Sequence, residues 1–177
     1  MNTLSAVQQK FVLHWGEMGA RWGINRTVAQ MHALLFISPK ALNAEEIANL
    51  LGVARSNVST SIKELQNWGI IRIVHVLGDR RDFFEATKDV WEMFRVVLDE
   101  RKKREIDPTI ALLRECVAES EKTKDTYTQE RLSEMRDFFE VTSNWYSQIS
   151  QLPTTAIQKF MKMGDRIRKL LGLGAGD

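Results

Sequence analysis

The stretch from residue 43 to 69, NAEEIANLLGVARSNVSTSIKELQNWG, constrains the fold more than any other. Asn43 followed three residues later by Glu46 predicts a capping box at the start of a helix, and Gly52 predicts the end of that helix. After a short turn, a second helix is expected from Arg55 to Trp68. Two short helices joined by a tight turn are typical of a helix-turn-helix.

The second helix has an apolar side and a polar side. Val58, Ile62 and Leu65 recur at intervals of four and three, so at about 100° per residue they share one face. The opposite side carries Ser56, Thr60, Lys63 and Asn67, with Asn57 and Ser59 on its flanks and Arg55 at the helix start.

Recognition helices meet DNA bases mainly through their N-terminal residues. The leading candidates for the major groove of double-stranded DNA are therefore Arg55, Ser56, Asn57 and Thr60, with Ser59 and Lys63 beside them. Arginine can pair with guanine and asparagine with adenine, whereas serine and threonine are less selective. A plain solvated surface helix is the alternative interpretation.

A β-hairpin is expected directly after the second helix. A β-branched run from Ile70 to Val76 and a shorter run from Phe83 to Thr87 flank a turn that contains Gly78 and Asp79. This pattern predicts two paired strands. A hairpin in this place makes the region a winged helix.

The tip of the hairpin is rich in charge. Arg80 and Arg81 are expected there, where they can reach phosphates or the minor groove. Their acidic neighbours Asp79 and Asp82 are expected to hold the arginine side chains through charge-assisted hydrogen bonds. A solvated tip whose charges neutralise one another is the alternative.

Two helices are expected before the central stretch. Apolar residues at intervals of three and four predict an amphipathic helix over residues 4–22. Gly16 and Gly19 within it imply close approach of another helix, because glycine in a helix costs roughly 1 kcal/mol relative to alanine. We interpret this helix as a dimerisation arm; packing on its own domain is the alternative. Asn25 is the expected cap of the next helix, residues 26–37.

The remainder of the chain is expected to be helical. One helix is predicted from Asp89 to about Glu105, and Asp107 with Pro108 is expected to begin a new one. A long helix follows over residues 126–149. The last predicted helix, residues 155–171, has a basic face that includes Arg166, Arg168 and Lys169, so it could touch a membrane surface. Dimer closure is the favoured interpretation, because the chain has much helical surface to bury.

The composition excludes several classes of protein. A net charge of +2 over 177 residues is too mild to imply a nucleic-acid partner by itself. Cys116 is the single cysteine, so an internal disulfide and a zinc cluster are excluded, and we expect no metal or cofactor. Neither a signal peptide nor a membrane span is predicted, which makes the cytoplasm the expected location. Scattered histidines and the lack of a phosphate-binding glycine loop argue against an enzyme.

Together these elements predict a mainly α-helical fold with a small β-hairpin wing, in which a winged helix-turn-helix is flanked by dimerisation helices. Residues 1–24 are expected to form the N-terminal dimerisation arm and residues 25–88 the DNA-binding domain. Residues 89–177 are expected to form a C-terminal helical region for dimerisation and effector binding.

Three phrases of the sequence carry a family resemblance: HWGEMGARWGINRTVAQMHALL (14–35), AEEIANLLGVARSNVSTSIKELQNWGIIRIVHVLGDRRDFFEA (44–86) and VWEMFRVVLDERKKREIDP (90–108). They resemble the MarR-type winged-helix regulators, and more closely their GbsR-like branch. The resemblance implies a homodimeric repressor or activator on a pseudo-palindromic operator, with its two recognition helices about one helical turn apart. It also implies that Asp79 orients Arg81 for the minor groove.

The resemblance further implies control by a small effector, and the GbsR-like branch suggests quaternary ammonium compounds. Such cations bind in aromatic cages. The aromatic candidates for effector binding are Trp15, Trp22, Trp91, Phe138, Trp145 and Tyr146. Ordinary core packing is the alternative for each of them. For the chain as a whole, the alternative function is a winged-helix module for protein–protein contact that does not bind DNA.

Overall fold

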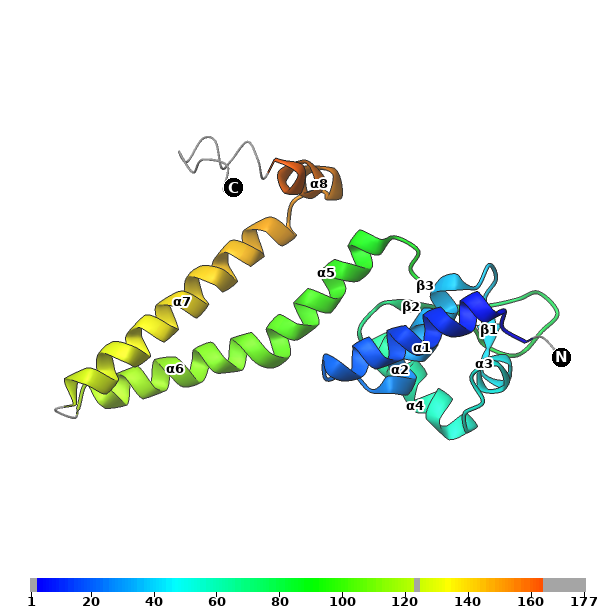
Figure 1. Cartoon of the computed structure of the whole chain (residues 1–177), viewed down its shortest axis with the longest axis horizontal. Helices are drawn as coiled ribbons and strands as arrows, with labels where there is room; N and C mark the ends of the chain where they lie inside the picture. The colour runs from blue at the N-terminus through cyan, green and yellow to red at the C-terminus, as the bar shows by residue number, and fades with distance from the viewer. Residues whose placement is uncertain (1–2, 123–124, 164–177) are drawn as a thin grey trace. The chain divides into compact units, whose positions relative to one another are not determined.

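The computed structural model describes residues 3–122 and 125–163 (Figure 1). The chain divides into two compact units, with the boundary between Val97 and Leu98. The first unit contains α1 (Ala6–Arg21), α2 (Arg26–Ile37), β1 (Leu42–Asn43), α3 (Ala44–Leu51), α4 (Arg55–Asn67), β2 (Ile71–Val74), β3 (Phe83–Ala86) and the first turns of α5 (Val90–Arg101). The second contains the end of α5, the π-helical segment η1 (Lys102–Ile106), α6 (Asp107–Ser120), α7 (Thr126–Ser150) and α8 (Thr154–Lys162). The predicted fold class is confirmed.

The core of the first unit lies between α2, α3, α4 and the sheet. Its most deeply buried side chains include Met31 and Leu34 of α2, Ile47 of α3, and Val58 and Leu65 of α4. They belong to one continuous hydrophobic cluster. Because Val58 and Leu65 are buried here, the opposite side of α4 faces outward, as the periodicity of the sequence predicts.

The predicted capping box of the helix-turn-helix is present at the start of α3. The Asn43 side chain accepts hydrogen bonds from the backbone N–H groups of Glu45 and Glu46, both at 3.0 Å, and the Glu46 carboxylate accepts one from the Asn43 backbone N–H at 2.9 Å. Gly52 ends the helix with φ +64°, a left-handed conformation that side chains rarely adopt.

The sheet has three strands, one more than the sequence predicts. Its order is β1-β3-β2, and both pairings are antiparallel. The predicted hairpin pairs Ile71 with Ala86 and Val74 with Phe83. The additional strand, β1, pairs Leu42 with Phe84 and therefore fixes the start of α3 to the hairpin.

The arm helix α1 packs against α2 of its own unit. A Cβ atom on Gly19 would lie 2.5 Å from the Cβ atom of Ala29, so the close approach that the glycines imply is made by α2. Other apolar side chains of α1, such as Val7 and Leu13, remain exposed. Dimerisation through this exposed side stays a prediction.

Helix α6 begins at Asp107 as predicted, but Asp107 is its first residue and Ile106 is its N-cap. The chain is helical from Val90 to Ser120, and η1 lies where the break was expected. A proline inside an α-helix lacks an N–H donor and clashes with a carbonyl of the preceding turn. The wider π-turn, in which the Asp107 N–H donates to the Lys102 carbonyl, lets the helix continue through Pro108.

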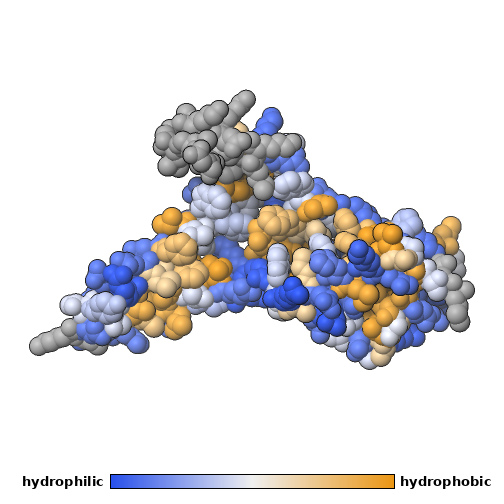
Figure 2. Space-filling view, in the orientation of Figure 1, coloured by the Kyte–Doolittle hydropathy of each residue, from blue (hydrophilic) through white to orange (hydrophobic). Residues whose placement is uncertain are grey.

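In the second unit α6 and α7 pack against each other. The Arg114 side chain of α6 donates to the Glu140 carboxylate of α7 at 2.6 Å. Large apolar side chains on α7 nevertheless remain more than half exposed, namely Tyr127, Met135, Phe138, Val141 and Trp145. Figure 2 shows hydrophobic surface mixed with hydrophilic surface over this pair of helices. The predicted basic residues Arg166, Arg168 and Lys169 lie outside the described residues.

Helices long and apolar enough to cross a membrane are not found in the part of the chain that the structure describes.

Replacement of Asn43 by alanine removes the cap of α3, so we expect the free energy of unfolding to fall by about 1–2 kcal/mol. Chemical denaturation followed by circular dichroism measures this change. Asn49 is exposed on the same helix and provides the matched control, since Asn49→Ala should change stability by about 0.5 kcal/mol or less. Equal losses in the two variants would show that the capping box does not stabilise α3.

Candidate nucleic-acid interface

A polar groove runs between α4 and the hairpin formed by β2 and β3. The candidate DNA-binding residues that line it are Arg55, Ser59, Lys63, Arg80 and Arg81. The first three come from one flank of α4 and the last two from the hairpin tip. The fold therefore brings together side chains that lie up to 26 positions apart in the sequence.

The groove is rich in cationic groups that can bind an anion. Arg55, Lys63 and Arg80 are exposed, and none of them forms an ion pair with another residue that the structure describes. Arginine and lysine side chains in such a state readily bind phosphate oxygens. Although the net charge of the whole chain is small, positive charge is therefore concentrated in this groove.

The other three candidates on α4 lie outside the groove. Ser56, Asn57 and Thr60 are exposed on α4 but do not line the cleft. The Thr60 hydroxyl donates to the Ser56 carbonyl at 3.2 Å, and the Ser59 hydroxyl donates to the Arg55 carbonyl at 3.1 Å. Each hydroxyl oxygen keeps lone pairs with which it can accept a hydrogen bond from a base or a water molecule. Two sides of α4 are thus polar, one facing the hairpin and one facing solvent.

Asp79 holds the Arg81 side chain at the hairpin tip. The Arg81 guanidinium donates through Nε to Oδ1 at 3.0 Å and through Nη2 to Oδ2 at 2.6 Å, and the Arg81 backbone N–H donates to Oδ1 at 3.0 Å. The Arg81 side chain is still 57% exposed. A fixed guanidinium loses less conformational entropy when it binds a partner, so this pair prepares Arg81 for contact.

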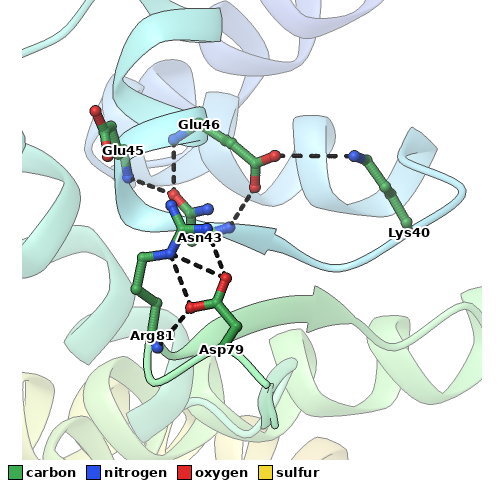
Figure 3. A network of polar contacts seen from close by, with 6 residues as sticks. All are labelled: Lys40, Asn43, Glu45, Glu46, Asp79 and Arg81. Atoms are coloured by element: carbon green, nitrogen blue, oxygen red, sulfur yellow. Dashed lines mark hydrogen bonds and ion pairs between the residues drawn. The ribbon is translucent and has the colours of Figure 1, made fainter. Parts of the chain in front are cut away.

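Hydrogen bonds from the Arg81 side chain and backbone lower the pKa of Asp79 from its ordinary value of 3.8 to about 2. Hydrogen bonding to Asp79 likewise raises the pKa of Arg81, with a smaller contribution from the charges of Glu45 and Glu46. Figure 3 shows the pair beside the start of α3, where Lys40 lies 3.8 Å from Glu46. Arg81 therefore stays charged and oriented at neutral pH.

The second aspartate at the tip has a different neighbour from the one expected. Asp82 Oδ1 lies 4.0 Å from Nδ1 of His75, which forms an ion pair when the imidazole is protonated. A hydrogen bond between Asp82 and an arginine is not found among the described residues. The expected contact between Asp82 and an arginine is therefore not made within the described residues.

Several lining residues of the groove, among them Gln66 and Glu45, were not assigned to this site from the sequence. Gln66 lines it from α4 and Glu45 lines it from α3. Gln66 lies seven positions after Ser59, so helical spacing was a signal that could have placed it on the same flank. Glu45 gave no such signal, because its position depends on how α3 packs against the sheet.

The structure separates the aromatic effector candidates into groups. Trp15 and Trp22 line an apolar cavity in the first unit. Phe138, Trp145 and Tyr146 line a groove in the second unit. Trp91 lines neither. Histidine, cysteine and acidic side chains of the described residues form no group of three that could hold a metal ion.

The pH dependence of Asp79 can be measured directly. Its folded pKa lies below its ordinary value, so the pair with Arg81 stabilises the hairpin fully above about pH 4, and this contribution is lost as pH falls through about 2. We expect carbon-13 NMR of the Asp79 carboxyl group to titrate near pH 2. In Arg81→Ala the midpoint should rise towards 3.8. A normal midpoint in the unmodified protein would contradict this pairing.

Comparisons with known proteins agree with this geometry. The sequence model of the MarR family matches residues 22–82. The transcriptional repressor GbsR of Bacillus subtilis, a helix-turn-helix protein, is 23% identical over 101 residues, which are 57% of this chain and 56% of the repressor. The chain is thus matched to little more than half the length of that curated relative.

Solved structures support the same fold. A crystal structure described as a transcriptional regulator has a TM-score of 0.58 and 23% identity, covering 88% of this chain and 99% of that one. A mutant of MepR from S. aureus bound to an oligodeoxyribonucleotide is 15% identical and covers 94% of this chain and 91% of its own, but its TM-score of 0.37 is too low to carry an argument. The chain therefore has a winged-helix fold, residues 22–82 match the MarR family model, and the sequence is similar to GbsR.

Proposed function

We propose that this chain is a sequence-specific DNA-binding transcriptional regulator and not an enzyme. The observation that carries the proposal is the groove between α4 and the hairpin, where Arg55, Lys63 and Arg80, which form no ion pair with another described residue, face one cleft. The similarity to a named transcriptional repressor supports it. A winged helix presents its second helix and its hairpin to DNA together, which is the arrangement of these residues.

The exposed N-terminal half of α4 is proposed to read bases in the major groove. Arg55 and Asn57 have side chains that can form two hydrogen bonds with guanine and adenine, respectively. Ser56 and Thr60 add shorter polar contacts. The burial of Val58 leaves these four residues on the accessible side of the helix.

The groove flank and the hairpin are proposed to contact the DNA backbone. Lys63 and Arg80 have no partners among the described residues and can neutralise phosphates. Arg81, held by Asp79, is proposed to enter the minor groove. Ser59 lines the groove from α4, together with Arg55 and Lys63. The acidic Glu45 would disfavour a phosphate placed too deeply, so the backbone should run along the outer rim of the groove.

We propose that the regulator acts as a homodimer on a pseudo-palindromic operator. Exposed apolar side chains on two elements support this state: Val7 and Leu13 on α1, and Phe138, Val141 and Trp145 on α7. Such surfaces are unfavourable in contact with water and are typical of regions that associate. Two copies would present two α4 helices to half-sites about one helical turn apart.

A small effector is also proposed, with a quaternary ammonium compound as its class. Of the aromatic candidates, Phe138, Trp145 and Tyr146 line one groove of the second unit together with Arg101, Lys102 and Glu105, whose carboxylate lies 3.5 Å from the Arg101 guanidinium. Aromatic faces and a carboxylate attract a quaternary cation. The Tyr146 hydroxyl donates to Asp99 at 2.8 Å, which fixes one ring of this groove.

Substitutions in the two parts of the surface should have different effects on DNA binding. Arg81→Ala should weaken binding to all sequences and reduce the slope of log affinity against log salt by about one, because one cation that displaces counterions from the DNA is lost. Asn57→Ala should change sequence preference at one position, with a cost of about 1–3 kcal/mol for the preferred base. Selection of bound DNA from a random pool and fluorescence anisotropy at several salt concentrations measure both effects.

The matched control is Lys122→Ala, which removes an exposed cation from the second unit and should leave affinity unchanged. Selected sequences should contain two related half-sites if the protein binds as a dimer. The alternative function, a winged helix used for protein–protein contact, predicts no affinity for DNA at any salt concentration. Absence of binding at low salt would therefore reject the proposal.

Choline tests the quaternary ammonium site. Isothermal titration should show binding at millimolar choline or below, and Trp145→Ala should weaken it by about fivefold to thirtyfold, since a desolvated cation–π contact contributes about 1–2 kcal/mol. Trp91→Ala is the comparison variant, because Trp91 lines no part of this groove. Unchanged affinity in Trp145→Ala would place any choline site elsewhere.

A further inference from the structure

The apex of the hairpin carries the most exposed of the large apolar side chains that the structure describes. Leu77 is fully exposed, and its neighbour Val76 is nearly half exposed. The hairpin belongs to neither α1 nor α7, the helices whose exposed apolar side chains are assigned to dimer contacts. Because single exposed leucines are common on protein surfaces, the geometry that presents Leu77 decides its meaning.

A tight β-turn presents Leu77 to solvent. The Asp79 backbone N–H donates to the Val76 carbonyl at 3.0 Å, which closes a turn with Leu77 in second place and Gly78 in third. Gly78 has φ +84°, the conformation that a type II turn requires at its third residue. Leu77 therefore stands at the outer corner of the turn, which agrees with its full exposure.

The turn is fixed to the arginine that is proposed to enter the minor groove. Asp79, the last residue of the turn, accepts a hydrogen bond from the Arg81 guanidinium at 2.6 Å (Figure 3). The Arg81 guanidinium also lies 5.7 Å from the centre of the Phe83 ring, at the start of β3. Leu77 and Arg81 are thus held by the same aspartate, so an arginine that enters a DNA groove brings the leucine with it.

The apex lies outside the polar groove. Arg80 and Arg81 line the groove between α4 and the hairpin, whereas Leu77 does not. The phosphate backbone of a DNA duplex separates its major groove from its minor groove. If the backbone runs along the rim of the polar groove and α4 faces the major groove, the apex faces the minor groove.

Charge and shape select the partner of the apex. Arg80 forms no ion pair with another described residue, and hydrogen bonding to Asp79 keeps Arg81 charged beside Leu77. Both arginines are attracted to the negative potential of the minor groove. That groove is about 6 Å wide, which admits one side chain at the corner of a turn but not a helix. Leucine has no hydrogen-bonding group, so the contacts open to it are with sugars and with the faces of bases.

We propose that Leu77 is an apolar wedge that enters the minor groove beside Arg81 and partly separates two stacked base pairs, so that the bound DNA bends. Apolar side chains inserted between base steps kink DNA towards the major groove by about 20–90°. Such a bend would curve the DNA around α4 in the adjacent major groove. This inference rests on the proposed function, because it assigns a further contact to the same DNA interface.

A wedge creates sequence preference without hydrogen bonds to bases. Steps from a pyrimidine to a purine separate more easily than other steps, so they are kinked at the smallest cost. Sequences selected by the unmodified protein should therefore contain a TA or CA step at the position of the hairpin. Leu77→Ala should lose this preference and keep the preferences at the positions that α4 contacts.

The wedge is measured in the full-length protein with a selected DNA duplex. 2-Aminopurine in place of the adenine of the preferred step gains fluorescence when it unstacks, and dyes at the two ends report the bend by energy transfer. The unmodified protein should raise the fluorescence and shorten the end-to-end distance. Leu77→Ala should abolish both changes and lower the affinity by about fivefold or more. Leu77→Met keeps an apolar wedge and should retain both changes.

Two further variants separate an apolar wedge from a general contact. Leu77→Lys adds a cation at the apex, so it should keep or raise the affinity at low salt and still leave the bases stacked. Val90→Ala is the matched control, because Val90 is an exposed apolar residue of the first unit outside the hairpin. It should change neither the affinity nor the fluorescence. Circular dichroism establishes that each variant is folded.

The outcomes distinguish the wedge from the proposed function. DNA that stays stacked and straight when the unmodified protein binds would overturn the wedge and leave the DNA-binding function intact. Unstacking and bending of the same size in Leu77→Ala or Leu77→Lys would also overturn it, and would leave the apex for a protein partner. A protein that binds no DNA even at low salt would reject the proposed function and the wedge with it.

Discussion

The burial of three side chains on one face of α4 fixes the functional surface of this protein. Val58, Ile62 and Leu65 pack into the same cluster as Met31 and Leu34 of α2. A helix with one face fixed in a core has no freedom to rotate about its axis, because rotation would expose that face. The positions of Arg55, Ser59 and Lys63 are therefore a consequence of packing on the opposite side of the helix.

A second constraint places the hairpin relative to α4. β3 is the central strand, and β1, which leads directly into α3, pairs with it. The capped start of α3 and the hairpin are therefore held together by backbone hydrogen bonds. Asp79 then fixes Arg81 near that same point, beside Glu45. Strand pairing determines the shape of the groove. The same pairing brings together the charged side chains that line it.

Local chemistry made much of the first unit predictable from sequence. The cap at Asn43, the glycine at position 52 and the hairpin depend on residues close together in the chain, and all three are present. β1 was missed because two residues give no periodic signal. Helix α6 starts at Asp107 as expected, but the preceding helix runs into it through η1, and this π-turn depends on backbone geometry that residue type does not report. The cavity was not predicted because His32 and Met93 come together only through packing.

The two ends of α4 have opposite chemical surroundings. Arg55 at its start faces a polar groove with unpaired cations, whereas Leu65 near its end and Trp68 just after it face an apolar cavity. An α-helix of 13 residues is about 20 Å long and bends little, so a shift at one end moves the other. Val58, Ile62 and Leu65 are buried along the length of the helix, so the core that orients it also limits how far it can move.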